Sequence, residues 1–90
     1  MERTVVVAIE EGLHARPAAL FVQAAGAQPV PVTIRKSSDT EDLEADSILS
    51  VMTLGAGAGT EVVLTTPGDT ADDVAALDAL ETFLSQTVIA

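Results

Sequence analysis

The 90-residue chain has no cysteine, no tryptophan and no tyrosine, and it has a single histidine. Without cysteine there is no disulfide framework and no thiolate zinc site, and nothing points to an oxidising compartment. No apolar run approaches the roughly 18 residues that a membrane-spanning helix needs. The apolar run near the N-terminus is too short for a signal peptide, and acidic residues follow it closely. We therefore expect one domain, residues 1–90, that is cytoplasmic and not inserted in a membrane.

Positive charge is also scarce, because four cations face fourteen acids and the net charge is −10. Residues 1–36 hold all four cations and three of the acids, whereas residues 37–90 hold eleven acids and no cation. A nucleic acid partner requires a basic surface that neutralises phosphates, so this balance argues against one. The acidic excess is explained most simply by solubility.

The most informative stretch is Gly-Leu-His-Ala-Arg-Pro-Ala over residues 12–18. Pro17 opens a run of small and apolar residues, and proline is well tolerated at the first position of a helix. We therefore expect His14 in the loop just before a helix, where backbone N–H groups and the positive end of the helix dipole favour an anion. An imidazole, the guanidinium of Arg16 and a helix start together indicate chemistry on a phosphoryl group.

Strands are predicted where β-branched residues cluster or alternate with polar ones. Pro31 cannot donate to a sheet ladder, so its strand is expected to start there or to lie at an edge. The glycine-rich stretch 55–59 is interpreted as a flexible loop and not as a phosphate-binding loop, because it follows a helix and lacks a Gly-Lys-Ser/Thr sequence. The expected strands cover residues 3–9, 30–35, 40–44 and 61–65.

Three helices are predicted from caps and from apolar periodicity. The first runs from Pro17 to about Gly26, and the second follows Asp46-Ser47 and ends at Gly55. The third begins at Asp69 or Thr70 with a near capping box to Asp73, and its apolar stripe comprises Leu77, Leu80 and Leu84. The resulting order, βαββαβα, predicts an α+β fold. We expect an open-faced β-sandwich, with three helices on one face of a four-stranded antiparallel sheet.

The order of these elements and the stretch at residues 12–18 resemble the HPr family, the histidine-containing phosphocarriers of the bacterial sugar phosphotransferase system. A second stretch, Asp-Ser-Ile-Leu-Ser-Val-Met-Thr-Leu-Gly over residues 46–55, resembles the regulatory-serine helix of that family. The spacing of the two stretches and the length of the chain also fit, so the resemblance covers essentially all 90 residues.

The resemblance implies a carrier and not an enzyme, with no cofactor and no metal. His14 would accept the phosphoryl group from phosphorylated Enzyme I, which derives it from phosphoenolpyruvate, and would pass it to sugar-specific IIA proteins. Arg16 matches the arginine beside the histidine of the family, whose phosphorylated atom is Nδ1. The protein would act as a monomer. The docking face would use the first two helices, with Ala19, Phe21, Ile48, Leu49 and Met52 as the candidate contacts.

Ser47 matches the position that a dedicated kinase phosphorylates in some relatives, so a serine kinase and phosphatase are candidate partners. The sequence departs from the family pattern nearby, with Asp46 where lysine is frequent and Ser50 where the family has glycine. Several lysines that relatives place near the docking face are absent as well. The simpler interpretation of Ser47 is a helix N-cap, which contributes about 1 kcal/mol to stability.

Histidine suits a carrier because its neutral imidazole nitrogen is nucleophilic near neutral pH. The planar guanidinium of Arg16 can engage two oxygens of a phosphoryl group during transfer. The sequence names neither the sugar nor the IIA partner.

Two alternatives remain open at this point. A regulatory or nitrogen-branch HPr-like adaptor would also be phosphorylated on His14 but would not supply sugar carriers. An acyl carrier protein would use Ser47 as its attachment site, and its all-helical fold conflicts with the valine-rich stretches at residues 4–9, 30–34 and 62–64.

Overall fold

The computed structural model describes residues 1–89 and confirms the predicted element order. The strands pair in the order β1-β4-β2-β3, and every neighbouring pair is antiparallel. This sheet rules out the all-helical acyl carrier alternative. The elements are β1 (Glu2–Val6), α1 (Ala15–Gly26), β2 (Thr33–Lys36), β3 (Leu43–Glu44), α2 (Ile48–Leu54), β4 (Glu61–Thr65) and α3 (Ala71–Leu84).

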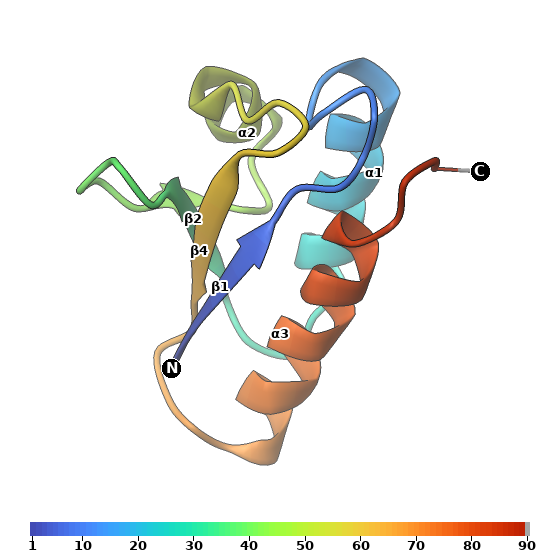
Figure 1. Cartoon of the computed structure of the whole chain (residues 1–90). Helices are drawn as coiled ribbons and strands as arrows, with labels where there is room; N and C mark the ends of the chain where they lie inside the picture. The colour runs from blue at the N-terminus through green and yellow to red at the C-terminus, as the bar shows by residue number, and fades with distance from the viewer. Residues whose placement is uncertain (90) are drawn as a thin grey trace.

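The three helices form a layer over one side of the sheet (Figure 1). Helices α1 and α3 lie next to each other, and α2 sits at one end of the layer, in contact with α1, β2 and β3. The predicted leucine stripe of α3 is confirmed, since Leu77, Leu80 and Leu84 are fully buried. One apolar core therefore fills the space between the sheet and the helices. Buried residues of α1, α2 and α3 belong to this core, which fixes the helices against the sheet.

The third helix begins as predicted, with Thr70 as N-cap and Asp73 completing the capping box. The Thr70 hydroxyl donates to the Asp73 carboxylate, and the backbone N–H groups of Gly68 and Thr70 donate to it at 3.1 Å each. The hydrogen bond from Thr70 is the main reason that the pKa of Asp73 falls to about 2, against the opposing effect of burial. Asp73 is therefore a buried carboxylate that stays ionised.

The strands are shorter than predicted at three places. Strand β1 ends at Val6 and not at Ile9. Val7 still donates to the Thr60 carbonyl in the register of the β1–β4 pair, but Ala8 donates to the carbonyl of Leu84 in α3. Strand β2 begins at Thr33, after Pro31, and lies inside the sheet, so the edge position considered for it is wrong. These strand ends are decided by long-range partners, which local alternation does not reveal.

The third strand has only two residues, whereas residues 40–44 were predicted. The preceding polar stretch does not join the ladder. It bonds to Arg35 instead, whose Nη1 donates to the Asp39 carbonyl at 3.0 Å and whose Nε lies 3.6 Å from Asp42 Oδ1. The half-buried Arg35 side chain thus takes the place of strand pairing in the β2–β3 hairpin.

Candidate functional site

His14 lies exposed at the start of α1, as the sequence predicts. It is the N-cap residue, with extended backbone angles, and its side chain does not cap the helix. The first N–H groups of a helix have no partner within the helix, and the helix dipole is positive there. No acidic residue in the first turn of α1 opposes this field. The imidazole therefore stands where added negative charge is stabilised.

The helix starts two residues earlier than predicted, so Pro17 occupies its third position and not its first. Proline is tolerated there for the same reason as at the first position, because N–H groups of the first turn have no helical partner. Arg16 consequently belongs to the first turn of α1 and is exposed, two residues after His14.

Ala15, between His14 and Arg16, has a backbone φ of +47°. Among the described residues it is the one residue other than glycine with a positive φ. This conformation costs an alanine roughly 1–2 kcal/mol. The sequence gives no sign of it, because alanine is an ordinary helix residue.

Gly12 allows the backbone before His14 to pass close to a second loop. Its φ is +72°, a region that favours glycine. A Cβ at this position would lie 2.8 Å from the Gly57 Cα, 3.0 Å from the Ala56 carbonyl oxygen and 3.1 Å from the His14 Cδ2. Only a residue without a side chain fits between the imidazole and the loop that follows α2.

The loop at residues 55–59 is packed at its first half, and its interpretation as flexible is wrong there. Ala56 is fully buried, and its carbonyl accepts a 2.8 Å hydrogen bond from the Leu13 N–H. Gly55 takes the left-handed conformation and ends α2, as predicted. The chain thus links the end of α2 directly to the segment that holds His14, a contact the sequence analysis missed.

Ser47 is the N-cap of α2, which confirms the simpler interpretation of this residue. Its hydroxyl accepts a 3.3 Å hydrogen bond from the Ser50 N–H, and its side chain is half-buried. The geometry explains the serine by helix capping alone. Its phosphorylation stays a prediction.

Four of the five candidate docking residues lie on the surface. Ala19 is exposed on α1, and on α2 the exposed fractions are 77% for Leu49, 55% for Met52 and 41% for Ile48.

Phe21 is the exception, and its assignment to the docking face is wrong. It is fully buried and meets Phe83 of α3 edge-to-face, with ring centroids 5.7 Å apart. Phenylalanine has a large apolar side chain, and burying it in the core removes more apolar surface from water than leaving it exposed on the docking face.

The two helices of this face run side by side in opposite directions. At one end, Gly12 and Leu13 contact Ala56 and Gly57; at the other, a Cβ on Gly26 would lie 3.9 Å from the Cβ of Asp46. The segment that holds His14 is therefore packed against the loop that follows α2.

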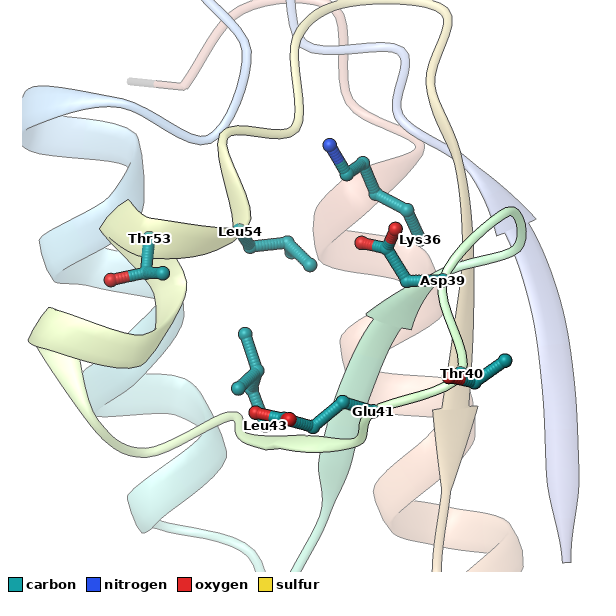
Figure 2. Close-up of a pocket in the computed structure, with 7 residues that line it drawn as sticks. All are labelled: Lys36, Asp39, Thr40, Glu41, Leu43, Thr53 and Leu54. Carbon is teal, nitrogen blue, oxygen red and sulfur yellow. The ribbon is translucent and has the colours of Figure 1, made fainter.

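A separate depression of about 310 Å³ opens between α2 and the β2–β3 hairpin (Figure 2). Leu43 and Leu54 point into it, and the Lys36 and Asp39 side chains stand near one another on its far wall. No residue assigned to the phosphoryl or docking site lines it. Within residues 1–89 no cluster of histidine, cysteine or carboxylate side chains has the makings of a metal site, and no helix is long and apolar enough to cross a membrane.

Comparison with known proteins places this geometry in a family. The family model described as "PTS HPr component phosphorylation site" matches residues 1–86. The phosphocarrier protein HPr of Streptomyces coelicolor is 47% identical over 94% of this chain and 88% of its own length.

Solved structures agree. The crystal structure of HPr from Bacillus anthracis covers 93% of this chain and 95% of its own, with 37% identity and a TM-score of 0.83. Crh of Bacillus subtilis, described as an intertwined dimer with a swapped domain, covers 96% of this chain and 94% of its own, with 39% identity and a TM-score of 0.69. With a family match over nearly its whole length and an open-faced sheet that presents one exposed histidine at a helix start, the chain belongs to the HPr family of phosphocarrier proteins.

Proposed function

We propose that the protein is a phosphoryl carrier in which His14 accepts the group from phosphorylated Enzyme I and passes it to sugar-specific IIA proteins. The observation that supports this most directly is the position of the single histidine, exposed at the first turn of α1 within a family defined by its phosphorylation site. Enzyme I and the IIA proteins are the partners of this family, and the catalytic groups belong to them.

The transfer step is a displacement at phosphorus. A lone pair of the imidazole nitrogen forms the new N–P bond while the bond from phosphorus to the donor breaks, and the donor keeps that electron pair. Negative charge is spread over the three equatorial oxygens, so stabilisation is mainly electrostatic. The N–H groups at the start of α1 and the guanidinium of Arg16 supply this stabilisation, and they remain beside the phosphorylated ring afterwards.

We assign the phosphoryl group to Nδ1 of His14, the atom used in the family. The orientation of the ring supports this choice. Cδ2 is the ring atom that a Cβ on Gly12 would meet, at 3.1 Å. Nδ1 is attached to the other side of Cγ, so it is on the ring edge that points away from this contact.

The docking face that we propose comprises Ala19 of α1 with Ile48, Leu49 and Met52 of α2, all of which are exposed. A carrier must leave each partner quickly, and small interfaces with a modest apolar centre suit such short encounters. A cytoplasmic location and a monomeric state fit this role. The monomer stays a prediction, since the similar Crh structure is a dimer.

A regulatory adaptor is the second candidate, supported by the similarity to Crh. Phosphorylation of Ser47 would belong to that role, and it would modify the residue that caps the first turn of α2. Transfer onward to a IIA protein separates the two candidates, because an adaptor would be phosphorylated without supplying sugar carriers.

The test is incubation with labelled phosphoenolpyruvate and Enzyme I, followed by addition of IIA proteins. Acid-labile label is expected on the wild-type protein and should be absent from His14→Ala. Arg16→Ala should be labelled more slowly while circular dichroism shows an intact fold. Equal labelling of wild type and His14→Ala would contradict the assignment of His14, and an unchanged rate for Arg16→Ala would remove the arginine from the transfer step.

A further inference from the structure

The segment that joins β1 to α1 contains no strand or helix, yet it is packed into the molecule. The side chains of Val7, Ile9 and Leu13 are fully buried within it. Withdrawing buried apolar side chains into water costs free energy, so they hold the segment down at both its ends. The part between them, Glu10 and Glu11, is exposed and depends on backbone hydrogen bonds for its position.

Those backbone hydrogen bonds go to the C-terminal end of the chain. The Ala8 N–H donates to the carbonyl of Leu84, the last residue of α3, at 2.9 Å. The Glu10 N–H donates to the carbonyl of Thr87, beyond the helix, also at 2.9 Å. In Figure 1 the C-terminal segment leaves α3 at the end of that helix nearer the start of α1. Residues 85–89 thus run beside the segment that leads to His14.

A turn connects this support to the functional site. The Gly12 N–H donates to the Ile9 carbonyl at 2.9 Å, which closes the turn around Glu10. His14 follows two residues later, and its Cδ2 is the ring atom that a Cβ on Gly12 would meet. The Leu13 N–H is bonded on the other side, to the loop that follows α2. The turn before His14 therefore has two supports, and the C-terminal segment is one of them.

The C-terminal segment needs an anchor of its own to act as a support. Its start is fixed at the end of α3, where the Ser85 and Gln86 N–H groups bond back to the last turn of the helix. Thr87 is exposed, and so is Val88, at 67%. Ile89 is half-buried and packs against the apolar core. The Ile89 side chain therefore holds the far side of the Thr87 carbonyl in place.

We propose that Ile89 is a positioning residue for phosphoryl transfer. By packing on the core it keeps the Thr87 carbonyl bonded to Glu10, and this bond fixes the turn that carries His14. This role rests on the proposed function and acts through the backbone, not through contact with the phosphoryl group. Transfer requires the reacting atoms to be aligned, and a misplacement of about 1 Å can cost about 100-fold in rate.

Three variants of the full chain test this role. Ile89→Thr keeps a β-branched side chain and replaces its apolar end by a hydroxyl, so the anchor is lost. Val88→Thr makes the same kind of change on the exposed neighbour and is the matched control. Ile89→Val is the conservative variant, which keeps an apolar side chain on the core and should transfer as wild type does.

Two measurements are made on each variant. The first is kcat and KM for phosphoryl transfer from the Enzyme I of the same genome. For Ile89→Thr we expect kcat to fall about fivefold or more and KM to stay within about twofold of wild type, since the exposed side of α2 is unchanged. The second is amide hydrogen exchange. The Glu10 amide should exchange at least about tenfold faster in Ile89→Thr, while the Leu13 amide keeps its wild-type rate.

An unchanged kcat in Ile89→Thr would overturn the inference, and so would a rise in KM alone, which is the mark of a docking contact. It is also overturned by a Glu10 amide that is unprotected in wild type or unaffected by the variant, or by Val88→Thr with the same defect. Equal acceleration of the Glu10 and Leu13 amides would assign Ile89 to overall stability instead. Failure of the proposed function looks different, because the wild-type protein would then take up no label.

Discussion

Replacement of Gly12 by alanine tests whether the contact between the two loops holds His14 in place. The new Cβ meets backbone atoms at 2.8 and 3.0 Å, which must move because neither can rotate away. The positive φ costs a residue with a side chain roughly 1–2 kcal/mol, and overpacking costs about 1–3 kcal/mol. We expect Gly12→Ala to lower the free energy of unfolding by about 2–5 kcal/mol.

A domain of this size has a stability of about 5–13 kcal/mol, so the variant should still fold and can be assayed. Urea denaturation gives the loss of stability. The NMR resonances of the His14 ring report its displacement, and the rate of labelling by Enzyme I reports its effect on transfer. We expect all three to change, since the Cβ would also lie 3.1 Å from the imidazole Cδ2.

Gly57→Ala is the matched control. It lies on the other side of the same contact, yet its Cβ would have no atom within 4 Å and its φ is not positive. It should resemble wild type in stability, ring resonances and rate. The reasoning is refuted if Gly12→Ala unfolds at the wild-type urea concentration, or if both glycine variants lose the same stability.

Three further substitutions follow from the structure. Ala15→Gly should leave stability unchanged or raise it by up to about 1 kcal/mol in urea, because it relieves the positive φ; the usual loss of about 1 kcal/mol for glycine in a helix would contradict this. Because the pKa of Asp73 is lowered to about 2, its contribution to stability is complete above its ordinary value near 3.8 and is lost as the pH falls toward 2. In Asp73→Asn, the free energy of unfolding followed by circular dichroism should change less with pH between about 2 and 4 than in wild type. A pH dependence parallel to that of wild type would argue against the lowered pKa of Asp73. Phe21→Ala should cost about 3–5 kcal/mol in thermal unfolding because it empties a fully buried site; a loss below about 1 kcal/mol is the result expected of a surface residue.

Much of the fold was predictable because its signals are local. Ser47 and Gly55 bracket α2, and Thr70 with Asp73 opens α3, since each cap acts within a few residues of the chain. Strand β4 was also placed correctly at residues 61–65. The element order followed from these boundaries, and with it the layered architecture.

The features that were missed depend on residues far apart in the sequence. Gly12 meets Gly57, and the chain leaves the β1–β4 ladder where Ala8 donates to Leu84 of α3. The burial of Phe21 depends on Phe83 of the last helix, because a helical pattern defines an apolar stripe but not its partner. No rule of propensity predicts a positive φ at Ala15, and such strain persists only where surrounding structure fixes the backbone.

The docking that we propose gives the short helix α2 a part in both halves of the site. One side of α2 exposes Leu49 and Met52, while its end leads through Gly55 into the buried Ala56, whose carbonyl holds Leu13 beside His14. In the docking that we propose, this link would set how far a partner on the exposed side of α2 lies from the imidazole. Phosphoryl transfer depends mainly on positioning, because the carrier itself supplies few catalytic groups. Substitutions that loosen the Ala56 link should therefore impair transfer to every partner, whereas substitutions of Leu49 or Met52 should affect each partner differently.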